Sequence, residues 1–360
     1  MRLRPYPDRE PLQLFSPGLS SHSLASIVAK VSPDIVHLSW IARGFLSPEN
    51  IRAIDRPIVW TLHDMWPFTG GCHYDSGCGK YLQRCGACPQ LHSRDDRDIS
   101  RRVWQRKQDA WRDLPMTIVT PSRWLGECAR GSALFRNCRV EVIPNGIDVA
   151  LYKPIDKAAA RSLFNLPLDR KLILLSAEKA ISDPRKGYQH LVPALRVLAD
   201  QGWADRAELM IVGSSRPADA PDLGMRVHYL GRLRDEASRV AAYSCADVSV
   251  TPSTQENLSN TVMESMACGV PVVAFGIGGM PDMISHGENG YLATPFEHAD
   301  LARGIAETIG DEVRHRHSCS LARHHVLQNY DSRLIAERHL ALYEDILGRT
   351  GPAASVGLAD

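Results

Sequence analysis

The stretch from Cys245 to Pro271 changes its hydrophobic period partway along, and this change constrains the fold more than any other feature of the chain. Asp247 to Thr251 has the pattern of a buried strand. Thr261 to Cys268 has the pattern of a helix, with Ser259 or Asn260 as its N-cap and with Gly269 and Pro271 after its end. A polar loop joins the two. A strand, a loop and a helix start in this order form the crevice in which open α/β sheets bind ligands.

Two carboxylates indicate what this crevice binds. The free N–H groups and the dipole at a helix start favour an anion such as phosphate. Glu256 in the loop and Glu264 in the helix would repel a phosphate, so we expect them to contact something uncharged. Because the Glu264 side chain leans back toward the helix start, both carboxylates can accept hydrogen bonds from hydroxyl groups that flank a phosphate. A nucleotide sugar has this layout.

The spacing Glu256-x7-Glu264, followed by the segment Ala267-Cys268-Gly269-Val270-Pro271-Val272-Val273, resembles the donor-site signature of family 4 retaining glycosyltransferases. The resemblance implies the GT-B fold, an α/β architecture of two Rossmann-like doubly wound domains that face a cleft. It implies sugar transfer with retention of configuration and no cofactor for catalysis. The alternative is that the two glutamates only belong to a solvated helix face. Four further residues are predicted to bind the donor together with Glu256 and Glu264: Asn257, Leu258, Asn260 and Thr261.

Composition excludes several classes of protein. The chain has 360 residues, enough for two domains, and its 42 basic and 41 acidic residues argue against nucleic acid as a partner. No run of 18 apolar residues is present, and residues 1–20 lack the apolar core of a signal peptide. The nine cysteines, an odd number, fit a reducing compartment better than a disulfide framework. We therefore expect a cytoplasmic protein, with at most weak peripheral contact with the inner face of the membrane.

The order of predicted elements divides the chain. Asn145-Gly146 is a strong turn signal inside a segment that resembles the crossover between GT-B domains. The predicted divisions are an acceptor-side domain over 1–145, a donor domain over 146–330, a helix over 331–347 that crosses back to the first domain, and a tail over 348–360. Predicted strands lie at 34–39, 57–62, 116–120 and 139–143 before the turn, and at 171–177, 207–213, 226–230, 247–251, 270–275 and 290–293 after it.

The first domain is expected to be incomplete. Only about four strands precede the turn, against six behind it, and the glycine-rich loop with which the family usually opens is missing before Ile35. This leaves a rival function open, a truncated homologue that binds a nucleotide sugar without turnover. A second rival is a GT-B epimerase or phosphorylase, although the lysine context for pyridoxal is not found.

Lys186 is the predicted partner of the donor diphosphate. It lies in Asp183-Pro184-Arg185-Lys186-Gly187 and resembles the lysine that the family uses to stabilise the leaving charge. The family usually places an arginine several residues earlier, where this chain has Ser176-Ala177-Glu178-Lys179. Arg185 or Lys179 is the candidate substitute. The alternative for the whole segment is a solvated basic loop.

His63 is the predicted contact to the donor sugar. It ends the strand Ile58-Val59-Trp60-Thr61-Leu62, and the carboxyl end of such a strand lies at the ligand edge of the sheet. The family carries a histidine at this position, where it orients the sugar. The alternative is a histidine satisfied at a strand end, with Asp64 as the N-cap of the next element.

Four cysteines, Cys72, Cys78, Cys85 and Cys88, fall within 17 residues. Cys85-Gly86-Ala87-Cys88 has the spacing of a zinc knuckle, and His73 and His92 are alternate ligands. A structural zinc is therefore predicted, against a cluster that forms for redox reasons or by chance. The block from His63 to Tyr74, HDMWPFTGGCHY, resembles a subgroup associated with bacterial polysaccharide synthesis.

Residues 94–113 carry two tryptophans, Trp104 and Trp111, which a helix would place on one face with Lys107. This face would suit anionic lipid, but a helix that packs its tryptophans into the core is favoured because the net charge of the segment is small. From the resemblance to the family, the predicted partners are a UDP- or GDP-linked sugar donor and a glycan or lipid-linked acceptor.

Overall fold

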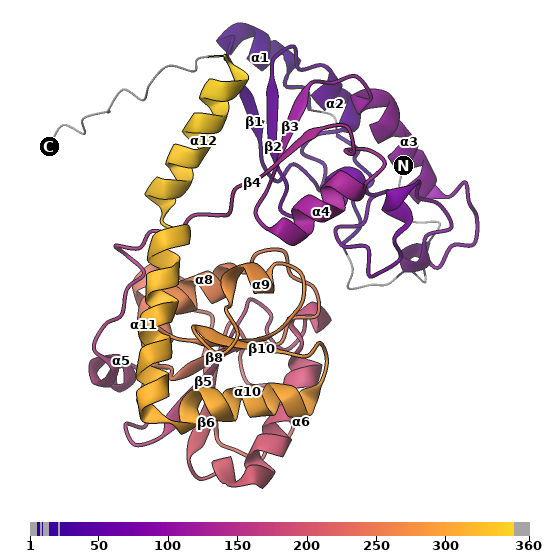
Figure 1. The fold of residues 1–360 in the computed structure, drawn as a ribbon. Helices are drawn as coiled ribbons and strands as arrows, with labels where there is room; N and C mark the ends of the chain where they lie inside the picture. The colour runs from indigo at the N-terminus through magenta and orange to yellow at the C-terminus, as the bar shows by residue number, and fades with distance from the viewer. Residues whose placement is uncertain (1–5, 8, 10–13, 21, 349–360) are drawn as a thin grey trace, which may run out of the picture.

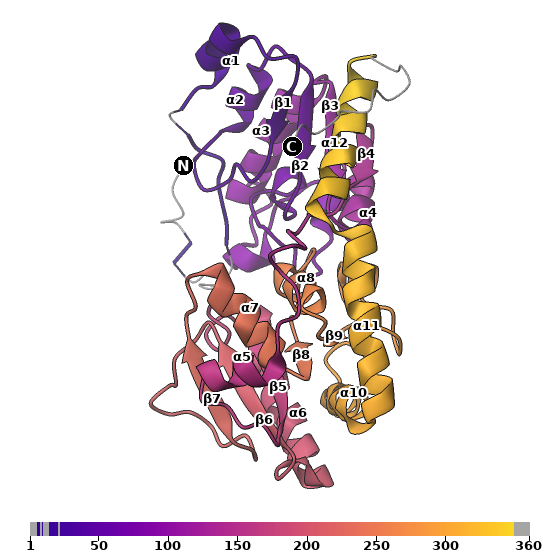
Figure 2. The same cartoon turned by 90° about the vertical axis from the view of Figure 1, so that its left-hand side faces the viewer.

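The computed structural model describes residues 6–348 apart from residues 8, 10–13 and 21. Two parallel sheets form two lobes, which Figures 1 and 2 show one above the other. The N-terminal sheet has four strands in the order β1-β2-β3-β4, and the C-terminal sheet has six in the order β10-β9-β8-β5-β6-β7. The predicted α/β fold with two Rossmann-like domains is confirmed, as are the four strands of the first sheet and the six of the second.

The N-terminal lobe surrounds its sheet with four helices and a loop-rich segment. Short 3-10 turns at 66–68, 80–82 and 89–91 punctuate that segment. The strands are β1 (Val36–Leu38), β2 (Ile58–Thr61), β3 (Met116–Thr120) and β4 (Arg139–Val142), and the helices are α1 (Ala25–Val31), α2 (Pro48–Arg52), α3 (Ile99–Trp111) and α4 (Arg123–Gly131).

The C-terminal lobe alternates strands and helices almost regularly. Its strands are apolar on both faces, which suits a parallel sheet covered on both sides. The strands are β5 (Lys171–Ser176), β6 (Ala207–Val212), β7 (Val227–Gly231), β8 (Val248–Thr251), β9 (Val272–Phe275) and β10 (Gly290–Ala293); the helices are α5 (Lys157–Leu163), α6 (Tyr188–Leu198), α7 (Glu236–Cys245), α8 (Asn260–Ala267), α9 (Met280–Met283), α10 (His298–Gly310) and α11 (Glu312–Asn329).

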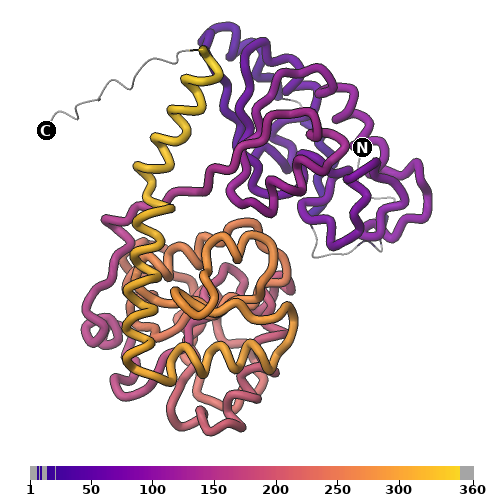
Figure 3. Tube along the Cα trace, in the orientation of Figure 1, coloured from indigo at the N-terminus to yellow at the C-terminus, as the bar shows by residue number. Residues whose placement is uncertain are grey.

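The chain passes between the lobes twice, as the tube in Figure 3 shows. The first passage follows β4, in the segment where the domain boundary is predicted. The second leads from α11, which runs along the C-terminal lobe, into α12 (Ser332–Ile346) beside the N-terminal lobe. Ile335 and Leu342 of α12 pack with Val59 and Val119 of the N-terminal sheet. Within the described residues, no helix is both long and apolar enough to cross a membrane.

Helix α3 packs into the core of its lobe. Trp104 is 5% exposed, Trp111 is 4% exposed and Lys107 is fully buried. The Lys107 ammonium donates to the carbonyls of Trp66 and Thr69 and lies 3.9 Å from the centre of the Trp66 ring. The prediction of a core-packing helix is confirmed, and the alternative in which this face meets lipid is wrong.

Candidate active site

Helix α8 begins where two central strands of the C-terminal sheet end. β5 and β8 are hydrogen-bonded neighbours although β6 and β7 lie between them in sequence, so the strand order switches here and the carboxyl ends of the strands frame a crevice. Ser259 caps the helix, because its hydroxyl accepts the N–H of Val262 at 3.4 Å. Gly269, with a φ of +73°, follows the last turn in the left-handed region that glycine favours. The predicted strand, loop and helix are all present.

Lys186 lies in a turn that is held against the loop after β8. Gly187 closes the turn with a φ of +75°, and a Cβ at this position would lie 1.7 Å from the carbonyl oxygen of Pro252. Only glycine permits this approach. The N–H of Thr254 donates to the carbonyl of Arg185 at 2.9 Å. As a result, Lys186 Nζ lies 3.0 Å from Glu256 Oε2.

Arg185, the neighbouring cation, is engaged elsewhere. Its Nη2 lies 2.7 Å from Asp183 Oδ2 and its Nε lies 3.2 Å from Asp183 Oδ1. Its guanidinium carbon lies 5.9 Å from the centre of the Tyr74 ring. Burial works to lower the Arg185 pKa, but the contacts with Asp183 outweigh it and raise the pKa. The other candidate, Lys179, is exposed and has a φ of +57°. Of these three cations, Lys186 is the one that contacts a predicted site carboxylate.

Glu264 lies one turn into α8, half-enclosed by α7. The Tyr243 hydroxyl donates to Glu264 Oε2 at 2.7 Å, and Arg239 Nη1 lies 3.9 Å from Oε1. Burial raises the pKa of the Glu264 carboxyl, although the hydrogen bond from Tyr243 and the charge of Arg239 work to lower it. The two predicted carboxylates therefore have different partners, an ammonium for Glu256 and a phenol for Glu264.

Asn257 joins the two lobes. Its Nδ2 donates to the carbonyl of His63 at 3.2 Å, and its Oδ1 accepts from the Ser122 hydroxyl at 2.6 Å. The backbone of this loop leaves no room behind it, because a Cβ on Gly279 would lie 1.7 Å from the Asn257 carbonyl oxygen. Leu258 is 7% exposed and packs in the core of the C-terminal lobe, so its side chain supports the loop. Asn257 thus places the loop of Glu256 opposite the end of β2.

His63 lies at the carboxyl end of β2, as predicted. Its Nε2 lies 3.0 Å from Ser39 Oγ at the end of β1. Burial lowers the His63 pKa because it disfavours the imidazolium, although the charge of Asp64 works to raise it. Asp64 accepts the N–H of Trp66 at 2.8 Å, but the residue at the N-cap position of the next turn is Met65, so the alternative role for Asp64 as that N-cap is wrong.

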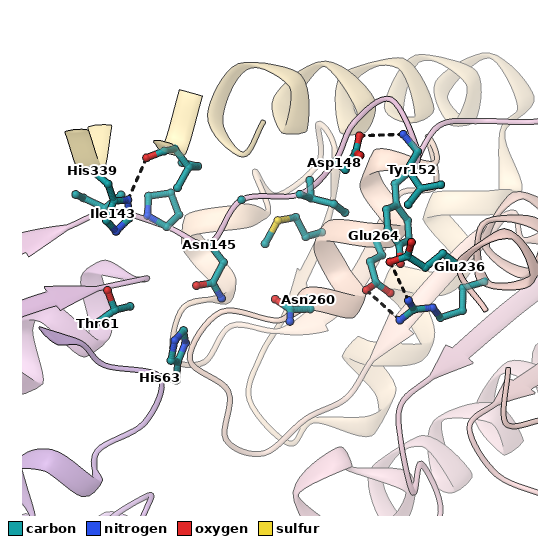
Figure 4. A pocket seen from close by; sticks show the side chains of 17 residues that line it. Thr61, His63, Ile143, Asn145, Asp148, Tyr152, Glu236, Asn260, Glu264 and His339 are labelled. Atoms are coloured by element: carbon teal, nitrogen blue, oxygen red, sulfur yellow. Dashed lines mark hydrogen bonds and ion pairs between the residues drawn. The ribbon is translucent and has the colours of Figure 1, made fainter. Parts of the chain in front are cut away.

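Two cavities meet at the start of α8. One of about 610 Å³ lies between the lobes, and Figure 4 shows His63 and Asn260 on its opposite walls. The other, of about 690 Å³, lies over the carboxyl ends of β5 and β6, beside Ser176, Gly213 and Thr261. Both are lined by Arg239, Asn260 and Glu264. A ligand laid across the helix start could therefore use Glu264 from either side.

Three contacts of this site were not predicted from the sequence. Tyr243 and Arg239, which approach Glu264, lie in α7 within an ordinary amphipathic pattern, and Ser122, which approaches Asn257, is the N-cap of α4. No local motif distinguishes them. Arg239 Nε is buried without a hydrogen-bond partner in the described part of the molecule, so this guanidinium has spare donor capacity beside Glu264.

The four predicted zinc ligands lie in one part of the N-terminal lobe. Cys72, Cys85 and Cys88 are buried and Cys78 is half-buried. Burial raises the pKa of the Cys85 thiol to about 12, and the N–H of Gly70, whose nitrogen lies 3.1 Å from Cys85 Sγ, works in the opposite direction. Within the described residues, no three His, Cys, Asp or Glu side chains are arranged to hold a metal ion. Zinc would require these side chains to converge further, and it stays a prediction.

Family models match both halves of the chain. Residues 2–151 match glycosyltransferase family 4, and residues 171–311 match the glycosyl transferases group 1. A D-inositol 3-phosphate glycosyltransferase from Acidothermus cellulolyticus is 30% identical over 234 residues, which are 61% of this chain and 51% of that protein. An N-acetyl-alpha-D-glucosaminyl L-malate synthase from Bacillus anthracis is 25% identical over 218 residues, 59% of this chain and 55% of that protein. The aligned part thus spans about half the length of these relatives.

Solved structures share the whole fold. Sucrose-phosphate synthase from Thermosynechococcus elongatus superposes with a TM-score of 0.68 at 22% identity, over 90% of this chain and 76% of that one. Anabaena HepE in complex with UDP superposes with a TM-score of 0.64 at 21% identity, over 89% of this chain and 82% of that one. These neighbours have the GT-B fold. The chain therefore has the GT-B fold, with a region at 2–151 that matches glycosyltransferase family 4 and a region at 171–311 that matches the glycosyl transferases group 1.

Proposed function

We propose that this protein transfers a hexose from a UDP- or GDP-linked donor to a hydroxyl group of a glycan or lipid-linked acceptor, with retention of configuration. The observation that carries the proposal is the contact of Lys186 with Glu256, in the loop that leads from β8 to the N-terminus of α8, the helix that carries Glu264. Anabaena HepE, which has the same fold, has been crystallised with UDP and with UDP-glucose. A nucleotide-sugar donor is the ligand that this set of groups suits best.

The diphosphate would lie against Lys186 and the helix start. The charge that develops on a departing diphosphate is stabilised by a fixed cation and by the free N–H groups of α8, among them those of Asn260 and Thr261. In this scheme helix dipole and cation supply the stabilisation, and no catalytic metal is needed. The leaving phosphate itself would accept the proton of the acceptor hydroxyl.

The remaining groups would orient the sugar and the nucleoside. Glu264 would accept hydrogen bonds from the ribose hydroxyls, and Glu256 would face the sugar and the positive charge that grows at its anomeric carbon. His63, whose pKa burial lowers, would hydrogen-bond a sugar hydroxyl from the other lobe. Asn257 would hold the two walls at the distance that lets both act on one donor.

The setting is proposed to be cytoplasmic synthesis of a cell-surface or exopolysaccharide glycan, at most in weak contact with the membrane. The resemblance of the block from His63 to Tyr74 to transferases of bacterial polysaccharide synthesis supports this setting. The rival function, binding of a nucleotide sugar without turnover, is not favoured, because both lobes contribute groups to the cleft.

A thermal-shift panel tests the proposal. A ligand that binds only the native state raises the melting temperature in proportion to the logarithm of its concentration over its dissociation constant. We expect one nucleoside diphosphate, and its sugar conjugate, to stabilise the protein, with UDP and GDP as the first pair compared. Release of the diphosphate from the stabilising donor then measures turnover. If no nucleotide or nucleotide sugar shifts the melting temperature, the proposal fails.

A further inference from the structure

We infer that Trp40 is the platform on which a sugar ring of the acceptor stacks. The inference rests on the proposed function and names the chemical class of the acceptor. Trp40 follows the end of β1 by two residues, at the ligand edge of the N-terminal sheet, and is 45% exposed although it is the largest kind of apolar side chain. An exposed tryptophan at the mouth of a cleft is a common anchor for a ligand.

The indole is held in place by buried polar groups. Trp40 Nε1 donates to Asp64 Oδ2 at 2.9 Å, and Asp64 is 7% exposed. Asp64 in turn is bound by His73, whose Nδ1 lies 2.6 Å from Oδ2. The other nitrogen of His73, Nε2, lies 2.8 Å from the Ser16 hydroxyl. This chain of contacts fixes the orientation of the Trp40 ring before any ligand arrives, which lowers the entropic cost of binding.

The same contacts determine what Trp40 offers to a ligand. The indole has one polar atom, and Asp64 already occupies it. What remains accessible is carbon surface. Trp40 therefore cannot donate a hydrogen bond to a ligand. It can contact a ligand only through its ring, which suits a ligand with a flat apolar face.

The residues beside Trp40 favour a sugar over a phosphate. Trp40 lines a small recess with Ser39, Thr61 and His63, and the last two also line the cleft cavity of Figure 4. Within the described residues, the lining of this recess includes no lysine or arginine. A pyranose combines an apolar C–H face with hydroxyl groups around its rim. An aromatic face beside hydroxyl and imidazole groups matches that combination.

The test compares Trp40→Ala, Trp40→Phe and a control, Phe45→Ala. Phe45 is 53% exposed, lies in the same loop and does not line the recess. Calorimetric titration of each protein, saturated with UDP, with a panel of methyl glucosides, galactosides, mannosides and N-acetylglucosaminides measures acceptor binding. Trp40→Ala should weaken binding of the best glycoside about tenfold or more, Trp40→Phe should lie between it and the parent, and Phe45→Ala should match the parent.

The outcomes separate the inference from the proposed function. All variants should bind UDP with the parental dissociation constant, because neither Trp40 nor Phe45 lines the two cavities at the start of α8. A parent protein that binds no nucleotide contradicts the proposed function itself. Two results overturn the inference alone, provided that the parent protein binds UDP. One is a parent protein that binds no glycoside, and the other is Trp40→Ala binding glycosides as tightly as the parent. If Trp40→Ala and Phe45→Ala lose glycoside binding equally and also lose binding to anionic vesicles equally, the two residues form a lipid-facing patch. This result also overturns the inference.

Discussion

Lys186 Nζ and Glu256 Oε2 lie 3.0 Å apart, so the cation expected to bind the diphosphate is paired with the carboxylate expected to face the sugar. The two side chains are 28% and 14% exposed, which limits the access of water to the pair. A bound diphosphate would compete with Glu256 for Lys186. We therefore expect donor binding to loosen this ion pair and to free the Glu256 carboxylate toward the sugar.

Replacement of Lys186 should weaken diphosphate binding selectively. A hydrogen bond to a charged group is worth roughly 1.5 to 3 kcal/mol, so Lys186→Ala should raise the dissociation constant of UDP about ten- to a hundredfold. Uridine, which lacks the phosphates, should bind the variant and the parent alike. Arg185→Ala is the matched control, because Arg185 is engaged by Asp183, and it should change UDP binding less. Calorimetry measures UDP binding and uridine binding by the parent, by Lys186→Ala and by Arg185→Ala. A larger loss in Arg185→Ala would show that the wrong cation has been assigned.

Glu264 should recognise the ribose. Glu264→Gln keeps the shape of the side chain but removes its charge, and we expect UDP binding to weaken about tenfold. A double-mutant cycle with 2′-deoxy-UDP and 3′-deoxy-UDP localises the contact, since two changes that remove the same interaction are not additive. At least one deoxy analogue should bind the parent more weakly than UDP does and bind Glu264→Gln as UDP does. Full additivity for both analogues would mean that Glu264 contacts another part of the ligand.

The burial of Glu264 also makes a prediction about stability and pH. Its folded-state pKa lies above 4.5, the ordinary value, because burial disfavours the charged form. The stability that the neutral carboxyl contributes is fully present below pH 4.5. It is lost as the pH rises through the folded-state pKa. Glu264→Gln should therefore melt at a higher temperature than the parent at pH 7 to 8, and this advantage should shrink toward pH 4.5. A variant that is less stable than the parent at pH 8 would show that the contacts with Tyr243 and Arg239 outweigh burial.

Zinc remains a prediction for the cysteines between Cys72 and Cys88. Native mass spectrometry of protein purified without a metal-affinity tag should show about one zinc per chain. The double variant Cys85→Ser, Cys88→Ser should lose it. Cys138→Ser, which removes a half-buried cysteine outside the group, is the control and should keep the metal. Parent protein that is folded and active without any metal contradicts this prediction.

Local sequence patterns were enough to predict most of the strands and helices of the fold. The strands at 116–120 and 290–293 have the predicted bounds, and α8 begins after Ser259 as its capping residue indicates. Each of these features depends on residues that are neighbours in sequence. The strand predicted at 226–230 is shifted by one residue, to 227–231, and the remaining strands are shorter than predicted by one to three residues at their ends.

Contacts between distant segments were beyond the reach of sequence patterns. The pairing of Lys186 with Glu256 joins residues 70 positions apart, and the Asn257 contact with His63 spans 194 positions and two lobes. Both depend on how closely the backbones approach, which Gly187 and Gly279 permit. The network beneath Trp40 was missed for the same reason, since Ser16, Asp64 and His73 carry no motif in common.

The division of labour between the two carboxylates is the central claim, and Glu256→Gln beside Glu264→Gln tests it most directly. Glu256→Gln removes a charge that matters most in the transition state, so it should bind UDP at least as tightly as the parent, with Lys186 released, yet lose most of its turnover of the nucleotide sugar. Glu264→Gln should instead lose affinity for UDP. Calorimetry with UDP and initial rates of UDP release from the full donor measure the two effects. If both variants bind and turn over like the parent, the pair is only a solvated helix start and the proposed donor site is wrong.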